Sequence, residues 1–185
     1  MIMQEALRFQ GHLTIRVLDA DTRKAKKTYD FPNVICTGML EAVQRLMTFY
    51  DELPTDIDYG TVAKENRLWA IYAGDDNTAP AYTDTALGNV LFKKACDAIA
   101  AGTPMSINVG GSVGLMEVQM TMEAAEGNSS PNPTYKEAGL YSRGDNDSPA
   151  ATAGARLLAR RIHPEIEKDS SIAIEYTWRV RLTAA

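Results

Sequence analysis

The segment from Ile172 to Leu182 alternates between apolar and polar side chains more regularly than any other part of the chain. One side of the alternation carries Ile172, Ile174, Tyr176, Trp178, Val180 and Leu182, and the other carries Ala173, Glu175, Thr177, Arg179 and Arg181. A period of two is typical of a β-strand with one face on a core and the other in water. Because a strand must pair with other strands, this segment predicts a β-sheet protein.

Other segments repeat this pattern. In the run from His12 to Phe31, alternating residues lead into the turn-forming letters DADTRK and then into a second short strand, which predicts a β-hairpin. Met116 to Glu123 alternates methionine or valine with polar residues, so one face is expected to be buried. Further strands are predicted at residues 67–74, as a central strand, at 134–142, and on both sides of the charged turn EKDSS, residues 167–171.

One helix is predicted near residues 38–50. Thr37 suits its N-cap, and Pro54 and the polar residues around it end it. Its predicted apolar face consists of Leu40, Val43, Met47 and Tyr50. Residues 87–101 fit two interpretations, a strand followed by a short helix or a helix throughout.

Many strands, one helix and no alternation of strands with helices predict a mainly β protein, an antiparallel β-sandwich of jelly-roll-like type. The 185 residues suffice for a single domain with a large core, spanning residues 1–185.

Composition argues against several classes of partner. The net charge of −5 disfavours nucleic acid as a binding partner. The sequence contains no run of 18 apolar residues, so no transmembrane helix is predicted. The first residues lack the pattern of a signal peptide, so we expect synthesis in a reducing cytoplasm. There, Cys36 and Cys96 are expected to be buried free thiols, although a single disulfide is the alternative.

Catalytic chemistry is not predicted. His12 and His163 are the only histidines, and both stand where a structural or solvated histidine is ordinary, so we expect no enzyme. Asp75, Asp76, Asn77 and Asp84 offer oxygen ligands for calcium, but their spacing matches no EF-hand and turn chemistry explains them. The glycine-rich letters NVGGSVG match no nucleotide-binding loop. We therefore expect neither metal nor cofactor.

The tripeptide Arg143-Gly144-Asp145 is one that adhesion receptors recognise. The letters around it, EAGLYSRGDND, suit a strand followed by a tight turn. We interpret the tripeptide as the tip of a loop.

The order of three sequence segments is more specific than any one of them. The segments are WAIYAGDDNTAPAYTDTAL, then TYKEAGLYS, then LLARRIHPEIEKDSSIAIEYTWRVRL. Together with the opening strand pair and helix, they resemble the small β-rich structural proteins of tailed bacteriophages, including their final hairpin. The segment GNVLFKK after Leu87 departs from that pattern.

The resemblance implies a non-enzymatic virion component that contacts other virion proteins and copies of itself. It implies a tail, collar or baseplate accessory protein. A capsid decoration protein and a receptor- or carbohydrate-binding module are the alternatives. The long loops are the expected assembly contacts, represented by Asp75, Asp76, Asn77, Asp84, Arg143 and Asp145. For a sugar-binding module, Tyr50, Tyr59 and Tyr82 are the available loop aromatics.

Overall fold

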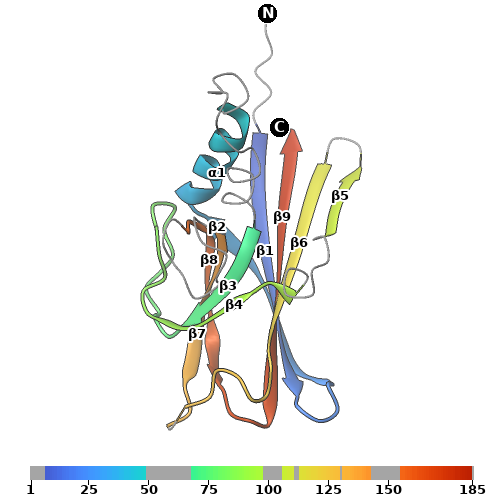
Figure 1. The fold of residues 1–185 in the computed structure, drawn as a ribbon, viewed down its shortest axis with the longest axis vertical. Helices are drawn as coiled ribbons and strands as arrows, with labels where there is room; N and C mark the ends of the chain where they lie inside the picture. The colour runs from blue at the N-terminus through green and yellow to red at the C-terminus, as the bar shows by residue number, and fades with distance from the viewer. Residues whose placement is uncertain are drawn as a thin grey trace, which may run out of the picture.

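The computed structural model describes residues 7–48, 68–97, 106–110, 113–129, 131–142 and 155–184. These residues form one helix and nine strands (Figure 1). Their bounds are β1 (Leu7–Asp19), β2 (Ala25–Ile35), α1 (Thr37–Thr48), β3 (Leu68–Gly74), β4 (Val90–Ala95), β5 (Ser106–Gly110), β6 (Val113–Met122), β7 (Thr134–Ser142), β8 (Leu157–Glu167) and β9 (Ile172–Ala184). None of the helical structure in the described residues is long and apolar enough to cross a membrane.

All the strands belong to one sheet, in the order β4-β3-β7-β8-β2-β1-β9-β6-β5, and every pairing is antiparallel. The sheet curls so that its two ends approach each other. The predicted mainly β, antiparallel architecture with one short helix is therefore confirmed, in the form of a single, nearly closed sheet.

Strand β2 joins the two halves of this sheet. Its residues 25–33 pair with β1, whereas only Val34 and Ile35 pair with β8, opposite Arg160 and Ala159. Beyond these two pairs β2 and β8 separate, and a hollow of about 360 Å³ lies between them. Val17, Tyr29 and Ile166 are among the residues that line it. The join between the halves is thus narrow.

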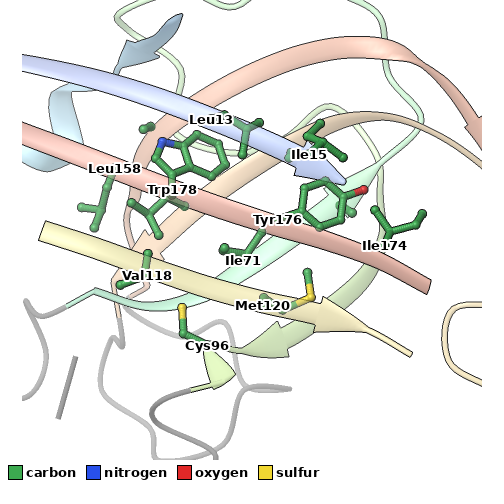
Figure 2. Packing of buried hydrophobic residues seen from close by; sticks show 14 of the residues in the cluster. Leu13, Ile15, Ile71, Cys96, Val118, Met120, Leu158, Ile174, Tyr176 and Trp178 are labelled. Atoms are coloured by element: carbon green, nitrogen blue, oxygen red, sulfur yellow. The ribbon is translucent and has the colours of Figure 1, made fainter. Parts of the chain in front are cut away.

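The core lies between the two halves, as Figure 2 shows. One half contributes the alternating side chains of β1, β6 and β9, and the other contributes residues of β3, β7 and β8. Fully buried members include Leu13, Ile15, Met120, Tyr176, Trp178, Ile71, Leu140 and Leu158. The middle of each predicted apolar face therefore does form core, with Trp178 at 0% exposure, while Leu182 lies outside the described side chains. Ala173 and Thr177, predicted to face water, are 0% and 6% exposed, so that part of the prediction is wrong.

Side chains close the seam where β4 meets β6. The Thr121 backbone N–H donates to Asp97 Oδ1 over 3.0 Å, and Lys94 Nζ donates to the Thr121 carbonyl oxygen over 2.8 Å. Lys94 also pairs with Glu126 at 2.7 Å. In a continuous sheet, the Thr121 N–H and carbonyl would form hydrogen bonds with a neighbouring strand. Here the side chains of Asp97 and Lys94 bind them instead, so the sheet closes without a continuous ladder of backbone hydrogen bonds.

The helix is where predicted, but its predicted apolar face is wrong in part. Leu40 is 44% exposed, while Met39 and Ala42 are each 3% exposed and belong to the core. Helix α1 packs against the start of β8, where Gly38 lies close to the Leu157 carbonyl. This contact buries Met39 and Ala42 in place of Leu40. Val43, Met47 and Tyr50 of the predicted face lie outside the described side chains.

Residues 90–95 of the ambiguous segment form strand β4, so the interpretation as a helix throughout is wrong. Pairing with β3 decides the matter, because Ala70, Ile71 and Tyr72 stand opposite Ala95, Lys94 and Lys93.

The final hairpin implied by the resemblance is also wrong. Strands β8 and β9 follow one another in sequence but lie in different halves, with β2 and β1 between them. In the turn that joins them, Lys168 has 0% exposure. Its Nζ donates to the Ala124 carbonyl, to Asn128 Oδ1 and to the Asp169 carbonyl, over 3.1, 2.9 and 2.8 Å. This lysine thus binds the 123–129 loop to the turn between β8 and β9.

Candidate functional site

The site predicted from sequence is the loop between β3 and β4, which carries Asp75, Asp76, Asn77 and Asp84. Arg143 and Asp145 lie outside the described residues, as do residues 51–60 and 143–154, where long loops are expected from the sequence. The described part of the predicted site is therefore the 75–89 loop.

Arg160 of β8 is the centre of this site. It is 4% exposed and contacts three carboxylates, two from the β3–β4 loop and one from β7. Its Nη2 lies 3.0 Å from Asp76 Oδ2 and 2.8 Å from Glu137 Oε2, and its Nη1 lies 2.8 Å from Asp84 Oδ2. The guanidinium thus ties the loop to strands β7 and β8.

Glu137 is the buried partner, with 0% exposure on β7. Besides Arg160, it accepts hydrogen bonds from the backbone N–H groups of Asn89 and Gly88, over 3.1 and 3.4 Å. Those amides end the loop, so Glu137 binds the loop backbone while Arg160 binds its side chains. A Cβ at Gly88 would overlap the Asp76 carboxylate, which explains why glycine stands there.

The loop also holds itself together. Asp76 Oδ1 accepts from the Thr78 N–H and hydroxyl, over 3.2 and 2.9 Å, and Asp84 Oδ2 accepts from the Ala81 N–H over 2.8 Å. Asn89 donates to Asp75 over 2.7 Å. The predicted turn chemistry of the aspartates is confirmed. Asn77, by contrast, is exposed at the surface of the loop.

The surroundings of Arg160, Asp76 and Asp84 favour the ionised form of each side chain. Burial opposes the charge of Arg160, but hydrogen bonds to Asp84 and Glu137 outweigh it and raise the pKa of Arg160. Thr78 and Arg160 lower the pKa of Asp76. For Asp84, burial acts in the opposite direction, yet the Ala81 N–H and Arg160 still lower its pKa. One cation is therefore shared by three carboxylates, each of which also accepts backbone N–H bonds.

Aromatic rings support the underside of the loop. The Tyr141 hydroxyl accepts from the Leu87 N–H over 2.9 Å, and its ring stacks on Tyr72 with 4.1 Å between centroids. Cys36 lies beside them as a free, buried thiol, and burial raises its pKa to about 11. Cys96 is free as well, and burial raises its pKa to about 12. The expectation of buried free thiols is confirmed, and both are poor nucleophiles.

Neither histidine joins this site. His163 is 4% exposed, and burial lowers its pKa to about 4. His12 lies on β1 in the other half of the sheet. Among the described residues, no group of three or more His, Cys, Asp or Glu side chains is arranged to hold a metal ion. The arrangement around Arg160 is suited to positioning a surface loop, since its donors and acceptors face one another.

Sequence reasoning found Asp76 and Asp84 but missed Glu137 and Arg160. Both stand inside strands, in the letters KEAGLY and LLARRI. Each charged residue stands at the boundary of an apolar run, next to Lys136 or Arg161. A charged side chain beside such a run was a usable signal, because such groups are buried only when paired.

Comparisons with known proteins add no identification. No family model, curated protein or solved structure matches this chain. The likeness to phage structural proteins therefore rests on the sequence blocks themselves.

Proposed function

We propose that this chain is a non-enzymatic structural component of a tailed-phage virion. It assembles with other virion proteins and with copies of itself, as a tail, collar or baseplate accessory protein. Its location is the virion, after synthesis in the host cytoplasm.

The observation that carries the proposal is the meeting of the three sequence blocks at Arg160. The first block supplies Asp76 and Asp84, the second Glu137, and the third Arg160 itself. The charged residues of these blocks serve to hold one long loop against the sheet. A loop held in one shape loses little conformational entropy when it meets a neighbour, which favours assembly.

Strand edges that no described strand pairs with support the same proposal. Among the described residues, β5 ends the sheet on one side, and β2 and β8 separate after two residue pairs. Unpaired edges are surfaces through which strands of other chains associate.

We propose that the two halves form a sandwich of jelly-roll-like type, since their apolar faces pack against each other across one core. Rigid sandwiches are suited to carrying contact loops.

The test uses phage particles produced without the chain and complemented with it. The wild-type protein is expected to copurify with particles and to be visible in cryo-EM difference maps. Asp84→Asn, which loosens the loop, is expected to melt as a folded protein but to be incorporated less. Lys27→Gln, a charge change on the exposed β1–β2 hairpin, serves as the control. Absence of the wild-type chain from particles would contradict the proposal.

A receptor- or carbohydrate-binding module is the second candidate, favoured by one observation. Tyr82 is 52% exposed on the 75–89 loop, where an aromatic ring offers a stacking surface. Tyr50 and Tyr59 lie outside the described residues. Glycan-array or host-cell binding that is lost in Tyr82→Ala, with normal particle incorporation, would favour this candidate over assembly.

A further inference from the structure

Two strand edges face each other where β2 and β8 separate. The ladder between these strands ends at the pair of Val34 with Arg160. Farther along, a hollow of about 360 Å³ lies between residues 26–29 of β2 and residues 165–167 of β8. We name this hollow the β2–β8 slot.

The edge of β2 directs backbone groups toward β8. Just beyond β2, the Cys36 N–H donates to the Leu158 carbonyl of β8 over 2.9 Å. Backbone groups of a strand point to the same side at every second residue, so those of Pro32, Asp30 and Thr28 are also directed toward β8. Proline has no N–H, which explains why the ladder stops next to it. Asp30 and Thr28 keep their donors and acceptors, and no described strand pairs with them on this side.

The edge of β8 contributes in the same way. Just beyond β8, the Lys168 N–H donates to the Pro133 carbonyl on the β7 side, over 2.9 Å. By the same alternation, the backbone groups of Glu167 point away from β7 and toward the slot. Unpaired N–H and C=O groups on an edge are a template for hydrogen bonds with a further strand. The slot therefore presents two such templates, one on each side.

The inner wall of the slot is apolar. Val17 and Ile166 line it and are 6% and 5% exposed. Tyr29 lines it as well and packs against the core. A strand between β2 and β8 has every second side chain on this inner side, where an apolar side chain is removed from water.

The rim of the slot carries charges of both signs. Lys26 and Lys27 stand on the β2 side, and Glu165 and Glu167 stand on the β8 side. A nucleic acid or an anionic membrane would be repelled by the two carboxylates, whereas a polypeptide backbone has no net charge. Exposed charges of this kind contribute little to binding, so backbone pairing and apolar contact decide which partner fits.

We propose that the β2–β8 slot accepts an extended segment of a different polypeptide as an added strand. The segment forms backbone hydrogen bonds with Thr28 and Asp30 on one side and with Glu167 on the other, and its apolar side chains contact Tyr29 and Ile166. Because β2 and β8 are antiparallel, the added strand is parallel to one of them and antiparallel to the other. Addition of a strand to an exposed edge is a known mode of peptide recognition. The inference rests on the proposed function, since it names the segment by which another virion protein attaches.

The experiment is a two-dimensional ¹H–¹⁵N NMR titration of the full chain with the peptide acetyl-Lys-Val-Thr-Val-Thr-Ile-Lys-amide, which alternates apolar and polar residues. We expect saturable shifts at the amides of residues 27–31 and 165–167, and slower hydrogen exchange at the Thr28 and Asp30 amides. The control is the same peptide with N-methyl groups on both valines, which keeps the side chains but removes two backbone donors. It should bind about tenfold more weakly or less, because two hydrogen bonds are lost.

A pair of variants tests the edge of β2 from the protein side. Thr28→Pro removes one N–H that faces the slot and none that faces β1, so it should weaken binding of the unmodified peptide by about three- to tenfold. Thr28→Val changes the side chain at the same position but keeps the N–H, and it should bind as the wild type does. Thermal melting checks that both variants are folded, and the N-methylated peptide tests the same point without any variant.

The proposal is overturned if the peptide shifts none of these amides, if the N-methylated peptide binds equally well, or if folded Thr28→Pro binds unchanged. Protection of the same amides that increases with protein concentration alone would assign the slot to a second copy of the chain, and would also overturn it. Failure of the virion role is seen separately, as absence of the chain from particles. Particles that contain the chain, together with a slot that binds no peptide, would contradict this inference alone.

Discussion

Arg160 and Glu137 form a buried ion pair between neighbouring strands, with Nη2 and Nε of the arginine 2.8 and 3.0 Å from Oε2 of the glutamate. The two residues are 4% and 0% exposed. Neither charge has access to bulk water, so each depends on the other.

Removal of the arginine is expected to destabilise the protein strongly. Arg160→Met leaves Glu137 buried without its cation, and the free energy of unfolding should fall by roughly 3–5 kcal/mol. Urea denaturation followed by tryptophan fluorescence measures this loss. The double variant Arg160→Met/Glu137→Leu should be more stable than Arg160→Met, because the uncompensated charge is gone. A double variant less stable than the single one would contradict the ion-pair interpretation.

The 75–89 loop is expected to open in acid before the core does. The pKa values of Asp76 and Asp84 are lower in the folded state than in the unfolded one. Their contribution is therefore complete above the unfolded aspartate pKa of about 3.9 and is lost as pH falls through the lower, folded values. Limited pepsin digestion below about pH 4 should cut this loop first. Asp84→Asn should be cut at higher pH than the wild type. If cleavage of the two proteins depends on pH in the same way, Asp84 does not hold the 75–89 loop in place.

A separate pH effect is expected from His163. Burial lowers its pKa to about 4, against an unfolded value of about 6.5. The unfolded state therefore gains a proton first as pH falls, and stability should decrease from about pH 6.5 until the folded pKa is passed. The total is on the order of 3 kcal/mol. In His163→Phe, the free energy of unfolding measured by chemical denaturation should depend less on pH between these two pKa values. An unchanged slope would mean that His163 titrates alike in both states.

The β9 strand offers a paired test. Trp178 is 0% exposed, so Trp178→Ala should cost roughly 3–5 kcal/mol through the cavity it leaves. Arg179 lies on the opposite face and its ion pair with Glu117 is partly exposed, so Arg179→Ala should change stability by no more than about 0.5 kcal/mol. Thermal melting compares the two. If Arg179→Ala folds normally yet fails to enter particles, the outer face of β9 is an assembly contact.

The seam between β4 and β6 predicts a local effect. Asp97→Ala removes the acceptor of the Thr121 N–H and hydroxyl, which now donate over 3.0 and 2.7 Å. A buried donor without a partner costs roughly 1–3 kcal/mol. Hydrogen exchange at the Thr121 amide should accelerate in Asp97→Ala and much less in Asp97→Asn, which keeps an acceptor oxygen. Equal protection in the two variants would show that another group closes the seam.

Much of the strand content could be predicted from sequence because it is a local property. Alternation along β9 and β6 shows which side chains share a face, and the central members of that face, such as Tyr176, Trp178 and Met120, are buried in the fold. The turn chemistry of Asp76 and Asp84 is local as well, since each carboxylate binds backbone groups two or three residues away.

Pairing was decided by tertiary structure. Strands β8 and β9 are neighbours in sequence, yet they lie in opposite halves, because β1 and β2 occupy the positions between them. A local pattern shows that a strand has an apolar face but not which distant strand covers it. For the same reason, contact with β8 selected Met39 and not Leu40 as the buried residue of α1.

The buried charges were likewise outside the reach of local patterns. Arg160 meets Glu137 across 23 residues of sequence and Asp84 across 76. Lys168 finds two of its acceptors, Ala124 and Asn128, on a loop about 40 residues earlier in the chain. A charged side chain enters a core only where distant partners replace its water, and that condition is met by the folded arrangement alone.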